Sequence, residues 1–107
     1  MEFDYDGESD ILFASTQPVP PTTSDPVAPD FFLLRHAHTD AIVGLECLDF
    51  SRHAQDPAWL AALPNTVIFL NADVGRAYTA GDIVERVWLE VRRRAGGKID
   101  QALVLAV

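Results

Sequence analysis

The hydrophobic positions of this chain concentrate in residues 30–49, where two apolar runs set the centre of the predicted fold. The runs are Phe31–Leu34 and Ile42–Leu48, and the polar stretch His36–Asp40 separates them. Phe, Leu, Ile and Val suit a pleated surface, and a short polar break between two such runs is typical of a hairpin. The pattern therefore predicts a central hairpin of two antiparallel strands.

Neither run alternates between apolar and polar residues. In an extended strand Phe31 and Leu33 would point to one face, and Phe32 and Leu34 to the other. Strands that are apolar on both faces need a cover on both. We expect helices on one face, and a second layer or a second copy of the chain on the other.

The N-terminal segment predicts a first hairpin. Glu2–Asp6 alternates, with Phe3 and Tyr5 set between acidic residues, which is the pattern of a half-exposed strand. An Asp-Gly pair ending at Gly7 follows, and this pair favours a tight turn because Gly tolerates a positive φ. Asp10–Ser15 then returns as the second strand.

Thr16–Pro29 contains five prolines and no glycine. Proline lacks the amide donor and favours extended polyproline geometry. We therefore expect a stiff, exposed connection that is neither strand nor helix. A plain linker is the simpler interpretation, and a proline-rich docking segment is the alternative.

The C-terminal half predicts helix, strand, helix and strand. Asp56 and Pro57 begin a short helix over Ala58–Leu63, and Thr66–Leu70 reads as a buried strand. Thr79 begins a longer helix through a capping box with Asp82. The apolar face of that helix consists of Ile83, Val84, Val87, Trp88 and Val91. The apolar ending Ala102–Val107 is expected to pair beside Thr66–Leu70, which would give a strand–helix–strand unit.

These elements predict a single α+β domain over residues 1–107. Its sheet is small and antiparallel, built from two hairpins plus one or two further strands, with two helices packed on one face. The predicted parts are a first hairpin (1–15), a proline-rich connection (16–29), a central hairpin (30–50) and a helix–strand–helix–strand extension (51–107).

The net charge of the chain limits the classes of molecule that it is expected to bind. The 107 residues carry a formal net charge of −8, which repels nucleic acid and anionic membranes and attracts a basic protein. The N-terminus lacks a signal-peptide pattern, and no apolar run reaches the roughly 20 residues of a membrane span. We therefore expect a cytoplasmic protein that binds neither nucleic acid nor membrane, and that forms homo-oligomers or binds a basic partner.

Two residues inside the second central strand stand out. Cys47 is the single cysteine, and in an apolar strand it reads as a small core residue rather than a nucleophile. Gly44 interrupts the strand, which indicates a bulge or the close approach of another backbone.

A His-x-His pair is the main candidate for metal chemistry. His36 and His38 would project to one side of a continuing strand, and Asp40 would join them as a ligand for zinc or another transition metal. Asp49 and His53 could complete the site. The alternative is a polar hairpin turn, in which His and Asp are common.

Little in the sequence indicates catalysis or a cofactor. Glu46 with Asp49 could form an acid–base pair, but no nucleophile motif or phosphate-binding loop accompanies them. The basic cluster Arg92–Arg94 suits the end of a helix, where cations complement the dipole. We expect no cofactor.

Residues 2–52 resemble a small bacterial family, domain of unknown function 2283. Tyr5-Asp6, then Asp10 and then Leu12-Phe13 match its opening. Residues 42–49, Ile-Val-Gly-Leu-Glu-Cys-Leu-Asp, match its close. The resemblance implies a small antiparallel sheet with a packed helix and suggests an interaction role, but it implies no activity. The long proline-rich connection and the turn at residues 37–40 depart from the family pattern.

The sequence therefore predicts a small acidic protein that self-assembles or interacts with a partner, a basic protein being the partner its charge favours. The alternative is a metal-binding protein or metal-dependent hydrolase that uses His36 and His38.

Overall fold

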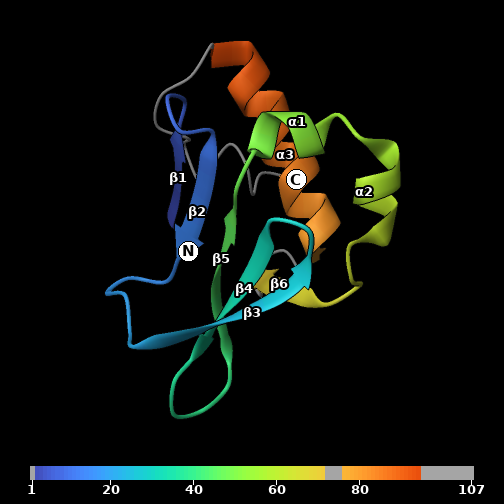
Figure 1. The fold of residues 1–107 in the computed structure, drawn as a ribbon. Coiled ribbons are helices and arrows are strands. Elements are labelled where there is room, and N and C mark those ends of the chain that lie inside the picture. The colour runs from blue at the N-terminus through green and yellow to red at the C-terminus, as the bar shows by residue number, and fades with distance from the viewer. Residues whose placement is uncertain (1, 72–75, 95–107) are drawn as a thin grey trace.

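The computed structural model describes residues 2–71 and 76–94 and shows an α+β fold (Figure 1). In chain order the elements are β1 (Glu2–Asp6), β2 (Ile11–Ser15), β3 (Thr22–Ala28), β4 (Phe31–His36), β5 (Ile42–Cys47), α1 (Phe50–Ala54), α2 (Pro57–Ala62), β6 (Val67–Asn71), β7 (Arg76–Thr79) and α3 (Ala80–Arg94). The predicted fold class is confirmed. Within the described residues, no helix has the length and apolar character that crossing a membrane requires.

The main sheet has five antiparallel strands in the order β1-β2-β5-β4-β3. Both predicted hairpins are present, as β1–β2 and β4–β5. They join side by side through β2 and β5, which pair over Leu12–Ser15 and Gly44–Cys47. The two hairpins therefore form one continuous surface.

The prediction for the proline-rich connection was wrong over Thr22–Ala28, because this segment is strand β3. It pairs with β4 at the edge of the sheet, and the register shifts between Pro26 and Ala28. An edge strand tolerates proline because the missing amide donor falls on the unpaired side or at an irregularity.

The predicted extension of the main sheet by Thr66–Leu70 also differs from the structure. Residues 67–70 do form a strand, but β6 pairs with β7 in a separate two-stranded sheet rather than with the main sheet. Neither β7 nor the short helix α1 was predicted. Val67 is 48% exposed, so β6 is not fully buried. The predicted strand Ala102–Val107 lies outside the described residues.

The core lies against one face of the main sheet. Cross-strand partners on that face include Leu12 with Cys47, and Leu33 with Leu45. They form one cluster with side chains from all three helices and from both strands of the small sheet. The helical members are Phe50, Ala54, Trp59, Ala80, Ile83, Val84, Val87 and Val91. The predicted apolar face of α3 is confirmed, with Trp88 partly buried beside the cluster.

Gly44 brings β2 and β5 unusually close together. A Cβ atom at this position would collide with the carbonyl oxygen of Ala14 and would lie 3.0 Å from the Cα of Ser15. The register between β4 and β5 also shifts beside it, between Leu34 and Arg35. The sequence predicted either a bulge or a close backbone approach at this glycine, and the close approach is confirmed.

Candidate functional site

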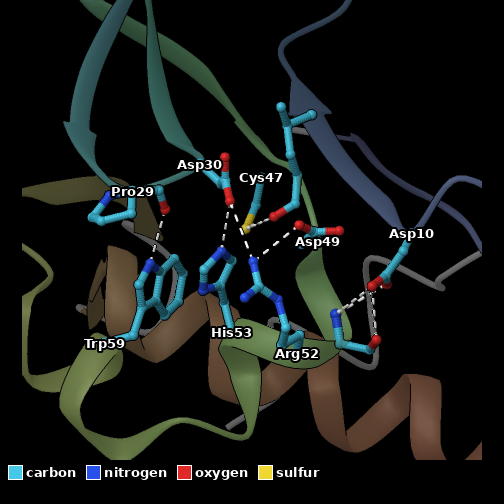
Figure 2. Close-up of polar contacts among 10 residues, drawn as sticks. Asp10, Pro29, Asp30, Cys47, Asp49, Arg52, His53 and Trp59 are labelled. Carbon is cyan, nitrogen blue, oxygen red and sulfur yellow. Dashed lines mark hydrogen bonds and ion pairs between the residues drawn. The ribbon is translucent and has the colours of Figure 1, made fainter.

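Three aspartates meet at one end of the main sheet, beside α1. Asp10 precedes β2, Asp30 precedes β4 and Asp49 follows β5, and antiparallel pairing places these positions at the same end. Their φ angles are 58°, 61° and 51°. Aspartate tolerates this left-handed conformation because its short polar side chain can bond locally. Figure 2 shows that these carboxylates contact residues of the α1 segment.

Asp10 holds the first hairpin against α1. Its carboxylate accepts hydrogen bonds from the Tyr5 hydroxyl (2.6 Å), the Ser51 amide (3.0 Å) and the Ser51 hydroxyl (2.7 Å). Burial by itself raises the pKa of Asp10, but the hydrogen bonds from Tyr5 and Ser51 outweigh it and hold the pKa below its usual 3.8. Burial, followed by the contact with Asp10, raises the pKa of Tyr5 to about 12.

A second contact between the strand ends and α1 joins Asp30 to His53. His53 is 7% exposed, and its Nε2 lies 2.8 Å from an Asp30 carboxylate oxygen. The ring of Trp59 stacks on the imidazole at 4.7 Å between centroids, and Trp59 Nε1 donates to the Pro29 carbonyl oxygen at 2.9 Å. These contacts fix the imidazole between the start of β4 and helix α2 (Figure 2).

Arg52 places a cation between the carboxylates of Asp49 and Asp30. Its Nη2 atom lies 3.0 Å from Asp49 Oδ2 and 3.7 Å from Asp30 Oδ2. The guanidinium therefore neutralises charge that would otherwise accumulate where the strands end. Because Arg52 and Asp49 are exposed, solvent weakens this pair, and its main effect is to orient the side chains.

Asp30, Asp49 and His53 form the one three-residue group in the described part of the chain that could hold a metal ion. Their ligand atoms lie within 4.8 Å of one another. Asp49 and His53 were considered as ligands from the sequence, and Asp30 was missed. Its position directly before an apolar strand was the available signal, because Asp is favoured in left-handed turn positions. A bound metal would have to compete with Arg52 for both carboxylates.

The predicted ligands His36, His38 and Asp40 lie at the opposite end of the central hairpin. Strand β4 ends at His36, whose Nδ1 accepts the amides of His38 (3.1 Å) and Thr39 (3.3 Å). Among the residues that the structure describes, these three side chains are not gathered into a three-ligand group like that of Asp30, Asp49 and His53. The imidazole of His36 instead organises the hairpin turn, and metal binding at these positions stays a prediction.

Cys47 is fully buried on the core face of β5. Burial, with the negative charges of Asp30, Asp10 and Asp49, raises the pKa of its thiol to about 12. The sulfur therefore stays protonated near neutral pH, which agrees with its interpretation as a core residue.

The face of the main sheet opposite the core carries a second candidate site, which we call the outer row. Successive cross-strand partners Asp4, Phe13, Glu46, Phe32 and Pro26 run across all five strands. Directly paired residues point to the same face, so these side chains lie together. The three central residues are half-buried, and the two end residues are exposed. The outer row therefore presents two aromatic rings beside carboxylates.

Glu46, which the sequence offered as half of an acid–base pair with Asp49, lies on the central strand of the sheet, between Phe13 and Phe32 on the adjacent strands. Its carboxylate stays half-exposed because the outer row faces away from the helical core. The sequence identified Glu46 as unusual but could not show which aromatic residues flank it.

Comparisons with protein-family models, curated proteins and solved structures find no match. The resemblance of residues 2–52 to domain of unknown function 2283 therefore stays a prediction.

Proposed function

We propose that this chain is a protein-interaction domain that binds a basic partner on the outer face of its main sheet. The observation that carries the proposal is the outer row, where Phe13 and Phe32 remain half-exposed on either side of Glu46. Aromatic residues supply most of the binding energy at many interfaces, and flanking carboxylates select the charge of the partner.

The charges around the outer row support a basic partner. Glu2, Asp4 and Asp6 are exposed along β1, on the same face as Phe13. The whole chain carries a net charge of −8. A basic protein would be drawn toward this face, and contact would place its cations beside carboxylates that already face solvent.

The residues at the strand ends favour a structural role over catalysis. Asp10 and Asp30 already bond within the protein, to Ser51 and His53 respectively. Cys47 is a buried thiol whose raised pKa keeps it protonated. These groups stabilise the end of the sheet that supports the outer face, and a substrate would have to displace them.

The proposal is tested by comparing the proteins captured by three forms of the full chain. The first is wild type, and the second carries Phe13→Thr with Phe32→Thr, which keeps strand propensity but removes both rings. The third carries Val67→Thr with Leu89→Gln, which removes two exposed apolar side chains elsewhere.

We expect a defined basic protein to bind wild type and the third form, and to bind purified wild type directly with an affinity that falls as salt rises. Loss from the second form alone supports the outer face. Equal retention by all three forms contradicts it, as does a captured partner that is acidic.

Self-association through the same face is the second outcome of this design. The half-exposed rings would suit a second copy, but a face-to-face dimer would bring acidic residues of both copies together. Analytical ultracentrifugation of wild type and of the Phe13→Thr, Phe32→Thr variant separates the cases. A wild-type dimer that becomes monomeric in the variant would assign the face to self-assembly instead.

Metal binding remains the alternative proposal, now supported best at Asp30, Asp49 and His53. Zinc titration followed through the histidine ring resonances tests it. Saturable, stoichiometric shifts at His53 would support this site, and shifts confined to His36 and His38 would support the predicted pair. Unchanged resonances would reject both.

A further inference from the structure

The two edges of the main sheet differ in their capacity to accept another strand. Within the described residues, β1 pairs with β2 alone and β3 pairs with β4 alone. Strand β3 carries Pro26 and a register irregularity next to it, and proline on an edge strand hinders further pairing. Strand β1 contains no proline and pairs with β2 in unbroken register. The edge of β1 is therefore the better template for an added strand.

The side chains of β1 specify what such a strand should look like. Phe3 and Tyr5 are buried on the core face, while Glu2, Asp4 and Asp6 are exposed on the outer face. An added strand would place alternate side chains opposite these carboxylates, because paired residues share a face. Lysine or arginine at alternate positions would match them, with apolar residues between.

The same charges oppose pairing between two copies of β1. An antiparallel twofold arrangement centred on Asp4 would set Asp4 against Asp4 and Glu2 against Asp6. Like charges directly opposite each other destabilise a strand pair. A shift by two residues still opposes acidic side chains, so the edge discriminates against its own copy and in favour of a basic strand.

We propose that β1 accepts an extended basic segment of a partner protein as a sixth strand, with Lys or Arg at alternate positions facing Glu2, Asp4 and Asp6. This inference rests on the proposed function, because the cations of the added strand continue the outer row beyond Asp4. Main-chain hydrogen bonds supply affinity in this mode, and alternate side chains supply specificity.

The test uses the isotope-labelled full chain and a capped octapeptide in which Lys and Val alternate. We expect amide shifts over residues 2–6 and slowed exchange of the β1 amides that point away from β2. One control peptide has Glu in place of each Lys. The other keeps the sequence but is N-methylated at two adjacent central residues, one Lys and one Val, which removes a main-chain donor from each edge of the peptide strand. Neither control should slow amide exchange in β1. The first peptide lacks complementary charge, and the second cannot form the full set of main-chain hydrogen bonds between strands.

Two variants of the chain carry the same change in charge at different places. Asp4→Lys should weaken binding of the Lys–Val peptide about tenfold, because an attractive cross-strand pair becomes repulsive. Glu85→Lys lies on an exposed position of α3, and it should change the affinity by less than about twofold because salt screens distant charges. Circular dichroism of both variants confirms that they fold.

The outcomes separate this inference from the function on which it rests. If the N-methylated peptide binds as tightly as its parent, or if both variants weaken binding equally, strand addition at β1 is wrong. Shifts at Phe13, Glu46 and Phe32 without protection of β1 also overturn strand addition, while the outer face keeps its proposed role. A peptide that affects neither β1 nor the outer row contradicts both.

Discussion

At the scale of single residues, a few positions are determined by contacts with segments that lie far away in the sequence. Gly44 is required because the β2 backbone occupies the space of its Cβ. Asp10 links Tyr5 in the first hairpin to Ser51 in α1. Each joins segments that lie tens of residues apart in the chain, and each leads to a prediction.

Gly44→Ala should lower the free energy of unfolding by about 2–4 kcal/mol, because the colliding atom is a carbonyl oxygen of the backbone, which cannot rotate away. Gly7→Ala is the matched control, since its added Cβ would meet nothing closer than Tyr5 Cε2 at 4.0 Å. Urea unfolding of both variants measures the difference. Equal stabilities would show that the strands can separate at Gly44 at little cost.

Asp10→Asn should lower the free energy of unfolding at pH 7 by about 1–3 kcal/mol, because charged hydrogen bonds to Tyr5 and Ser51 are weakened. The pKa of Asp10 is lowered in the folded protein, so its ionised carboxylate stabilises the fold above pH 3.8, and this stabilisation is lost as the pH falls through the folded-state pKa. The difference in the free energy of unfolding between wild type and Asp10→Asn should therefore shrink below about pH 4.

Urea unfolding of wild type and Asp10→Asn between pH 7 and pH 3 measures this difference in the free energy of unfolding. Glu8→Gln is the control, because Glu8 is exposed in the neighbouring turn. A gap that stays constant over this range would mean that the ionised form of Asp10 contributes nothing beyond its shape.

At the scale of elements, α3 illustrates how local chemistry positions a helix. The Thr79 amide donates to Asp82 Oδ2 at 3.0 Å, and the Asp82 amide donates to Thr79 Oγ1 at 3.3 Å. This reciprocal pair is the capping box expected from the sequence. It begins the helix directly after β7, so that Ile83 and Val84 enter the core.

Thr79→Ala and Asp82→Ala should each cost about 0.5–2 kcal/mol in the free energy of unfolding, as for other lost helix caps. Together they should cost less than the sum, because either change alone disrupts the reciprocal pair. Glu85→Ala, an exposed position one turn later, should change stability by less than about 0.5 kcal/mol. Strict additivity in a double-mutant cycle would contradict the reciprocal arrangement.

At the scale of the whole molecule, the excess of acidic residues acts on stability. The chain contains sixteen acidic and eight basic side chains. Ion pairs such as that of Arg35 with Asp25, at 3.1 Å, relieve only part of the repulsion between the acidic groups. The remaining repulsion favours expansion of the chain, and salt screens it.

Raising sodium chloride from about 20 mM to about 300 mM should therefore raise the melting temperature, by about 4–8 °C for each 1 kcal/mol gained. The variant Asp4→Asn with Asp6→Asn removes two negative charges from β1 and should show a smaller rise. A melting temperature that falls with salt would indicate that attractive ion pairs outweigh the net repulsion.

Local sequence patterns were sufficient for the elements whose signals are carried by adjacent residues. The alternation of Glu2–Asp6, the cap at Asp56 and the apolar face of α3 each predicted an element that the structure confirms. The close approach at Gly44 was also predicted, because glycine inside an apolar strand commonly marks a bulge or a close backbone contact.

Tertiary structure alone decided how these elements pair and which side chains meet. The prolines of residues 16–29 argued against a strand, but the edge position of β3 provides the unpaired side that makes one possible. Asp30 and His53 are distant in sequence and come into contact only because α1 lies beside the start of β4. Phe13 and Phe32 are also distant in sequence, and strand pairing places them on either side of Glu46. Sequence alone determined the α+β class and the acidic character of this protein, because both follow from local pattern and composition. Its candidate sites required the fold, because long-range pairing brings their residues together.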